Sequence, residues 1–136
     1  MTSPEFSPSQ VIIYPARTQE RAARAMRCAP FRLQLFAAMD KQGVELRAIA
    51  GESGVKHRYT RYLLSELAAE SSLLWLIQVG ILRREVDGQG ITDCFRLTPL
   101  GHQLTEKWQQ QGSSWATPQW LDRWRNALAQ WLRLPF

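Results

Sequence analysis

The feature that most constrains the fold is a pair of β-prone segments joined by a short turn and followed at once by a helix-start signal. Ile81–Val86 and Ile91–Leu97 flank the sequence Asp-Gly-Gln-Gly, and Thr98-Pro99 then supplies an N-cap and a first-turn proline. Apolar and β-branched residues on both sides of Asp-Gly are typical of a β-hairpin. We therefore predict an antiparallel hairpin that leads directly into a helix whose apolar residues recur at four-residue steps.

Apolar periodicity predicts two helices in the first third of the chain. The first covers Thr18–Cys28, with Thr18 as its N-cap, and it carries a stripe of arginines. The second covers Phe31–Lys41 and ends before Gly43. Its apolar face consists of Phe31, Leu35, Phe36 and Met39.

The middle of the chain has the spacing of two short helices separated by a tight turn. We expect a helix over Glu45–Ser53, a turn at Gly54-Val55, and a further helix that begins near His57. The side chains expected to pack this second helix against the core are Val55, Tyr59, Leu63 and Leu67.

Taken together, these segments resemble the winged helix-turn-helix regulators, the broad group that contains the MarR-like, PadR-like and ArsR-like repressors. The resemblance covers about residues 30–108 and is strongest where the hairpin runs into Leu-Thr-Pro-Leu-Gly. It implies a mainly α (α+β) fold: a winged helix-turn-helix with a two-stranded β-hairpin wing and extra N- and C-terminal helices. The expected organisation is a flexible arm over 1–17, a winged-helix domain over 18–110 and a Trp-rich helix over 111–136.

Two positions depart from the pattern of those regulators. Thr60 stands where they usually have Val or Ile, although its methyl group can still face the core. The interval before Gly80 is about two helical turns longer than in compact members, and Ser71–Val79 is the apparent insertion. This insertion either lengthens the recognition helix or forms a separate helix before the wing.

The resemblance implies that the helix from His57 enters the major groove of DNA while the hairpin contacts phosphates or the minor groove. The residues matched to DNA-facing positions are Lys56, His57, Arg58, Arg61 and Tyr62, with Arg83, Arg84 and Arg96 in the wing. An arginine fork suits guanine, whereas a lysine is a point charge better suited to phosphate. The formal net charge of +5, from 17 basic and 12 acidic residues, agrees with an anionic partner.

Tryptophan is concentrated near the C-terminus, where a helix is expected to follow Thr117-Pro118. An apolar stripe on this helix could pack in the core, form a dimer interface or lie in a membrane interface. We favour the dimer, because one small domain cannot easily bury so many indole rings. The expected dimerisation residues are Trp120, Leu121, Trp124, Leu128, Trp131 and Leu132.

The sequence thus predicts a homodimeric, sequence-specific regulator of transcription that binds double-stranded DNA. The alternative is a winged-helix protein-interaction module whose Trp-rich helix docks a partner without binding DNA. The dimerisation domain of small-molecule O-methyltransferases carries a similar hairpin and binds no DNA.

Other function classes have little support in the sequence. The chain shows no nucleophile–base pair or Gly-rich phosphate loop, so we expect no enzyme. Cys28, Cys94, His57 and His102 are too isolated to predict a metal site, and no cofactor is expected. Neither a signal peptide nor a membrane span is evident, which predicts a cytoplasmic protein without membrane insertion.

Overall fold

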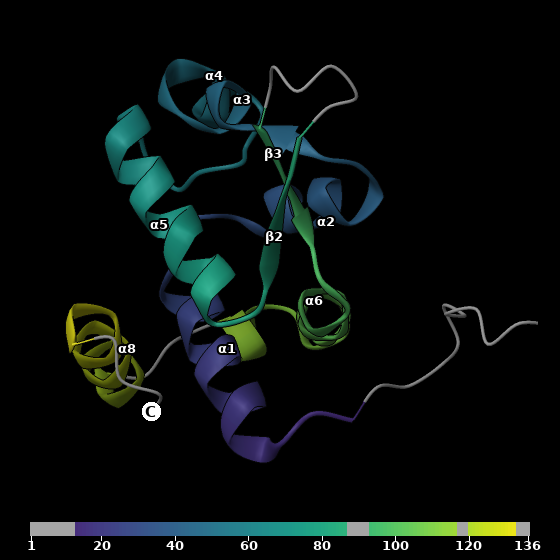
Figure 1. Cartoon of the computed structure of the whole chain (residues 1–136), viewed down its shortest axis with the longest axis vertical. Helices are drawn as coiled ribbons and strands as arrows, with labels where there is room; N and C mark the ends of the chain where they lie inside the picture. The colour runs from purple at the N-terminus through teal and green to yellow at the C-terminus, as the bar shows by residue number, and fades with distance from the viewer. Residues whose placement is uncertain (1–12, 87–92, 117–119, 133–136) are drawn as a thin grey trace, which may run out of the picture.

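The computed structural model describes residues 13–86, 93–116 and 120–132 of the chain. The expected Asp-Gly turn of the hairpin and the Thr117-Pro118 helix start lie outside the described residues, as does most of the arm expected over 1–17. Within the part described, the chain is mainly helical and has one small antiparallel sheet (Figure 1). This is the α+β class that the sequence predicts.

Along the chain, helices precede and follow the strands of the sheet. The helices are α1 (Ala16–Cys28), α2 (Leu33–Lys41), α3 (Leu46–Ile49), α4 (Gly51–Lys56), α5 (Glu66–Gln78), α6 (Pro99–Gln111), α7 (Ser113–Ala116) and α8 (Trp120–Leu132). The strands are β1 (Val44–Glu45), β2 (Leu82–Val86) and β3 (Asp93–Leu97), in the spatial order β1-β3-β2.

The two predicted hairpin strands are confirmed. β2 and β3 pair antiparallel over five residues, from Leu82 opposite Leu97 to Val86 opposite Asp93. The sheet also contains β1, which pairs with β3 through Val44 opposite Phe95 and which periodicity did not indicate. Two residues are too few to show an alternating pattern, so only tertiary pairing defines this strand.

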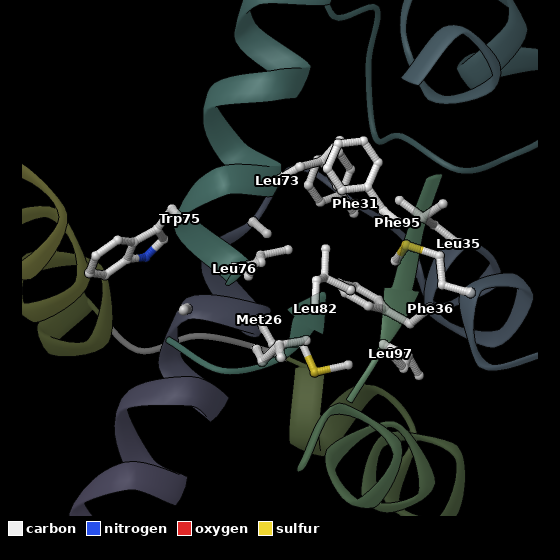
Figure 2. Close-up of a cluster of buried hydrophobic side chains, with 14 of the residues drawn as sticks. Met26, Phe31, Leu35, Phe36, Leu73, Trp75, Leu76, Leu82, Phe95 and Leu97 are labelled. Atoms are coloured by element: carbon white, nitrogen blue, oxygen red, sulfur yellow. The ribbon is translucent and has the colours of Figure 1, made fainter. Parts of the chain in front are cut away.

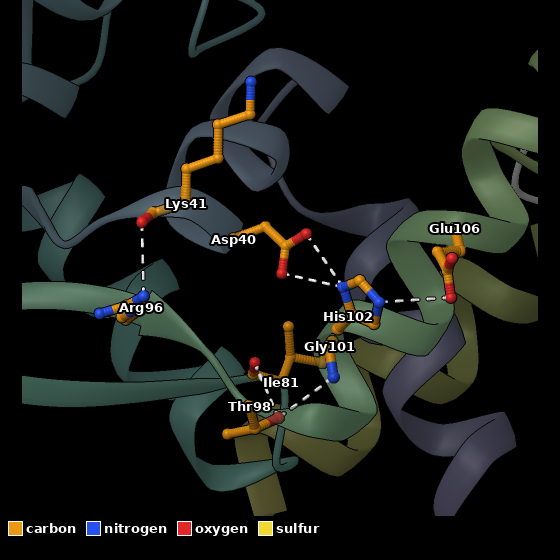
Figure 3. A network of polar contacts seen from close by, with 8 residues as sticks. All are labelled: Asp40, Lys41, Ile81, Arg96, Thr98, Gly101, His102 and Glu106. Carbon is orange, nitrogen blue, oxygen red and sulfur yellow. Dashed lines mark hydrogen bonds and ion pairs between the residues drawn. The ribbon is translucent and has the colours of Figure 1, made fainter. Parts of the chain in front are cut away.

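The helix start after the hairpin is also confirmed. The Oγ1 of Thr98 accepts a hydrogen bond from the backbone N–H of Gly101 at 3.1 Å, and it donates to the carbonyl oxygens of Gly80 and Ile81. Thr98 therefore caps α6 and ties its first turn to the strand entry. Figure 3 shows this cap beside a second link, in which Asp40 of α2 accepts from His102 of α6 at 2.9 Å.

One hydrophobic core joins the sheet to the surrounding helices. The four residues of the predicted apolar face are fully buried, Phe31 just before α2 and Leu35, Phe36 and Met39 within it. Met26 of α1 and Phe95 of β3 are buried with them. Figure 2 shows Leu73 and Leu76 of α5 turned toward this core, whereas Trp75 points the other way, toward α8. Trp75 donates from its indole N–H to the Oδ1 of Asn126 at 3.0 Å, which fixes α8 against α5.

The prediction of a helix beginning near His57 is wrong. Residues 57–65 form no helix, and Phe31 and Thr60 are instead joined by an antiparallel β-bridge. The N–H of Arg32 donates to the carbonyl of Tyr59 at 2.9 Å, and the N–H of Arg61 donates to that of Pro30 at 3.0 Å. These long-range bonds satisfy backbone groups that a helix would have used, so the segment is held extended.

Three of the four side chains expected to anchor that helix are exposed, whereas Tyr59 packs against the core as predicted. Leu63 is 63% exposed, and Val55, although helical, is 45% exposed. The residues that point inward from this segment are Thr60 and Leu64, at 2% and 6% exposure. Thr60 thus faces the core, as its position in the pattern predicted.

Further boundaries differ from the sequence prediction. α1 begins at Ala16 with Pro15 as its N-cap, so Thr18 lies inside the helix and does not cap it, and α2 begins at Leu33 and not at Phe31.

The helix expected over Glu45–Ser53 is split into α3 and α4 at Ala50, and Gly54 and Val55 lie inside α4 instead of forming a turn. Gly54 is needed where α4 meets the end of α3, because an added Cβ would lie 1.8 Å from the carbonyl oxygen of Ile49.

The next helix, α5, begins only at Glu66. Ser65 is its N-cap and accepts from the N–H of Ala68 at 3.1 Å. Apart from Val79, its C-cap, the apparent insertion Ser71–Val79 lies within α5, so these residues form no separate helix.

Candidate nucleic-acid interface

The candidate site is the turn that leaves α4, which contains five of the eight residues predicted to contact DNA. The N–H of Tyr59 donates to the carbonyl of Gly54 at 2.8 Å, and that of Arg58 donates to the carbonyl of Val55 at 3.1 Å. This pair of bonds is a Schellman motif, in which the residue after the C-cap adopts a left-handed conformation. That residue is Arg58, and its φ is +61°.

Arg58 occupies a backbone conformation that favours glycine. A side chain with a Cβ costs about 1–2 kcal/mol there, because the Cβ crowds the following carbonyl oxygen. Arg58 is the one non-glycine residue with positive φ among the residues described. The turn directs an exposed guanidinium outward at some cost in stability.

The five predicted side chains of this turn are all exposed. Lys56 and Arg58 form no ion pair within the described part of the chain. The Nη2 of Arg61 donates to the carbonyl oxygen of Arg27 at 3.4 Å, which directs this side chain back toward the end of α1. His57 stacks on Tyr59 with ring centroids 5.4 Å apart, and its Nδ1 lies 2.8 Å from the carbonyl oxygen of Ser53.

Three of these residues line one surface hollow of about 730 Å³. Its lining consists of Glu52, Ser53, Val55, Lys56, His57, Tyr62 and Leu63. Tyr62 is 59% exposed and contributes an aromatic ring to the hollow that Lys56 and His57 also line. The lining thus combines Lys56, His57 and the carboxylate of Glu52 with apolar surface from Val55 and Leu63, which the sequence prediction placed in the core.

The hairpin arginines do not extend the positive charge of this turn, because each lies near a carboxylate. Arg83 and Arg96 lie opposite each other in the β2–β3 ladder, and Glu85 contacts both, at 2.9 Å and 3.9 Å. Arg84 lies 3.6 Å from Asp93 and 4.0 Å from Glu70 of α5. Nearby carboxylates offset all three cations, so the hairpin contributes little net positive charge.

The sequence predicts a helix before the hairpin, but it starts that helix near His57, whereas α5 begins only at Glu66. The α5 sequence, ELAAESSLLWLIQ, contains two glutamates and no basic residue. Its exposed surface includes Leu67 at 77% and Leu74 at 41%. The signal that could have located its start is Ser65 followed by Glu66, an N-cap with an acidic first turn.

The predicted dimerisation stripe lies on α8, and part of it is exposed. Trp124 is 57% exposed, Leu128 37% and Trp131 81%, while the side chains of Trp120, Leu121 and Leu132 lie outside the description. Ala129 is buried, and α8 packs on α1 through a different face. Trp75, Trp108 and Trp115 are buried within the chain, whereas Trp124 and Trp131 are exposed to solvent.

Two other findings on the described residues concern membranes and metals. None of their helices is long and apolar enough to cross a membrane. Within the same ranges, no group of three or more His, Cys, Asp or Glu side chains is arranged to hold a metal ion.

Comparison with known proteins identifies one family. The model of the Npun_F0494-like family matches residues 12–130, which is most of the chain. A search of curated proteins and a search of solved structures each found no match. The chain belongs to the Npun_F0494-like family.

Proposed function

We propose that this chain is a winged-helix protein that binds double-stranded DNA as a homodimer and regulates transcription. The observation that carries the proposal is the exposed cationic turn after α4, where Lys56 and Arg58 have no carboxylate partner among the described residues. Unpaired, exposed cations are suited to phosphates, whose neutralisation releases counterions.

The order of the elements supports the winged-helix reading. A helix (α2), a short strand (β1), the α3–α4 pair and α5 precede the β2–β3 hairpin, and α6 follows it. In this order α5, and not a helix from His57, occupies the place of the recognition helix.

The charge of α5 nevertheless argues against its insertion into a groove. Glu66 and Glu70 would bring negative charge to the phosphates, and the helix itself carries no arginine or lysine, although Glu70 lies 4.0 Å from Arg84 of β2. We therefore place the DNA contacts on the turn before α5. Lys56 would contact phosphate and Arg58 a phosphate or a guanine edge, while the paired hairpin arginines would contribute less.

The test is to enrich binding sites from a pool of random duplexes and to measure affinity by fluorescence anisotropy at several salt concentrations. Lys56→Gln and Arg58→Gly are each expected to weaken binding about tenfold and to lower the salt slope by about 1. Lys41→Gln, which removes an exposed lysine of α2, is the matched control and should leave affinity unchanged.

Arg58→Gly also separates binding from folding. Glycine relieves the left-handed strain at this position, so the variant should unfold at the same denaturant concentration as the wild type or a higher one. A stable Arg58→Gly protein with undiminished DNA affinity would overturn the proposed contact. Failure to enrich any duplex would overturn DNA binding itself.

The homodimer is proposed through the exposed stripe of α8. Trp124, Leu128 and Trp131 follow one another at four- and three-residue spacing, so they lie on one helix face. In a two-fold dimer each copy would cover this stripe with the same stripe of its partner. Exposed indole rings are the side chains most enriched among residues that dominate binding energy.

Point substitutions test the dimer better than deletion of the C-terminal segment, because deletion would also remove the buried Trp115 and Ala129. Trp124→Ser/Trp131→Ser is expected to shift sedimentation velocity from dimer to monomer. Leu67→Ser, at a 77% exposed leucine of α5, is the matched control and should stay dimeric. A dimer that persists in the double variant places the interface elsewhere.

A protein-interaction module is the second candidate. It is favoured by exposed apolar side chains in the turn after α4 and on α5. Val55, Tyr62 and Leu63 are exposed around one hollow, and α5 exposes Leu67 and Leu74. Exposed apolar side chains near one another are typical of docking surfaces. Salt discriminates between the candidates, since phosphate contacts weaken steeply as salt rises and an apolar interface does not.

A further inference from the structure

A second cationic site lies in the part of the molecule formed by α1, α6 and α8. Figure 1 shows these helices at one end of the folded molecule and α3 and α4 at the opposite end. A hollow of about 500 Å³ lies among them. Its lining consists of Ala16, Gln19, Glu20, Ala23, Arg24, Arg27, Leu104, Lys107, Trp115 and Arg125.

Four cationic side chains from three helices line this hollow. Arg24 and Arg27 belong to α1, Lys107 to α6 and Arg125 to α8. Among the described lining residues Glu20 is the single carboxylate, so positive charge is in excess. A hollow lined by one sign of charge concentrates its field and attracts counter-ions.

Burial makes this different from an ordinary basic surface. Arg24 is 7% exposed, which places its charge where solvent screens it weakly. Arg27 donates from Nε to the carbonyl oxygen of Trp115 at 2.9 Å, and its guanidinium lies 4.9 Å from the centre of the Trp115 ring. Trp115 thus holds the guanidinium of Arg27 in one orientation.

Apolar groups complete the wall. Ala23, Leu104 and Trp115 line the same hollow and are all buried or nearly so. A volume of about 500 Å³ lies within the usual range of small-molecule sites, which is roughly 300–1,000 Å³. The lining therefore offers cations for a head group and apolar surface for a body.

We propose that this hollow binds a small organic anion, with a carboxylate or phosphate head on the arginines and an apolar body against Leu104 and Trp115. The guanidinium fork matches the oxygens of either head group. A bound anion would contact the four lining cations Arg24, Arg27, Lys107 and Arg125. Because α1, α6 and α8 each contribute one or two of these cations, the ligand would also link α8 to the rest of the chain.

The experiment is isothermal titration calorimetry of the full chain with phenyl phosphate and with benzoate, at constant ionic strength set by sodium chloride. Saturable binding of one molecule per chain is expected for at least one probe, and the stronger one identifies the preferred head group. The bound probe should also raise the unfolding temperature. No DNA is present, so the result is independent of the proposed DNA binding.

Variants at the rim test the location without disturbing buried Arg24. Lys107→Gln and Arg125→Gln are each expected to weaken binding at least fivefold. Arg123→Gln, an exposed arginine of α8 outside the lining, is the matched control and should change affinity less than twofold. No saturable binding of either probe, or an equal loss with Arg123→Gln, would overturn the proposal.

Discussion

Gly54→Ala most directly tests how α3 and α4 are packed. A Cβ added at Gly54 would lie 1.8 Å from the carbonyl oxygen of Ile49 and 2.7 Å from its carbonyl carbon. Both are backbone atoms, and real Cβ atoms essentially never come within 3.0 Å of a neighbour. One backbone must therefore move by about 1.2 Å, the difference between 3.0 Å and 1.8 Å.

The surrounding hydrogen bonds oppose this backbone shift, because a shift would lengthen or break them. The carbonyl of Gly54 accepts from Tyr59 at 2.8 Å, and the N–H of Gly51 donates to the carbonyl of Leu64 at 2.7 Å. Overpacking costs typically 1–3 kcal/mol, and here the neighbour is backbone, so the cost exceeds the roughly 1 kcal/mol that alanine gains in helix propensity. We expect a net loss of about 2 kcal/mol in the free energy of unfolding and a Tm about 8 °C lower.

Urea denaturation followed by far-ultraviolet circular dichroism measures this loss. Gly51→Ala is the matched control, because Gly51 has a φ of +66° and open space around it. That variant should lose only the strain of a left-handed alanine, about 1 kcal/mol. Gly54→Ala as stable as Gly51→Ala, or as the wild type, would refute the close approach of α3 and α4.

Three further predictions concern single side chains, each measured as a change in the free energy of unfolding by urea denaturation. Thr60→Val should stabilise by about 1 kcal/mol, because the buried Oγ1 of Thr60 has no hydrogen-bond partner in the described structure; a loss would show that the hydroxyl is satisfied. Asn126→Ala should cost about 1–2 kcal/mol by leaving the indole N–H of Trp75 unpartnered, and no loss would mean that α8 docks otherwise. Thr98→Val should cost about 1–2 kcal/mol, because it removes the cap of α6. Thr105→Val in the same helix is the control and should not destabilise, because the buried hydroxyl of Thr105 has no hydrogen-bond partner in the described structure. Equal effects of the two substitutions would contradict both assignments.

The parts of the fold that sequence predicted well are those with local causes. The β2–β3 strands follow from apolar and β-branched residues around Asp-Gly, and the start of α6 follows from Thr98 and Pro99. The buried face of α2, formed by Leu35, Phe36 and Met39, follows from helical spacing alone. In each case the residues that decide the structure are close together in the chain.

The candidate site was predicted in part. The sequence indicated that Lys56 and Arg58 are exposed, because charged side chains seldom lie in a core, but it placed Arg58 on a helix and not in a turn. It could not indicate that Glu85 offsets Arg83 and Arg96, since strand register decides which charges meet. Nor could it bring Arg24, Lys107 and Arg125 to one hollow, because they lie on helices far apart in the chain.

The segment after α4 shows where local reasoning stops. The spacing of Tyr59, Leu63 and Leu67 fits a helix, and Ser65-Glu66 is a local signal that the helix starts later. The sequence by itself determined the α+β class, the hairpin strands, the Thr98 cap of α6 and the exposure of the basic residues around Arg58. Tertiary structure decided the conformation of residues 57–65, because hydrogen bonds to Pro30 and Arg32 replace those of a helix. It also decided which charges are offset and which tryptophans are buried, since both depend on contacts between residues distant in the chain.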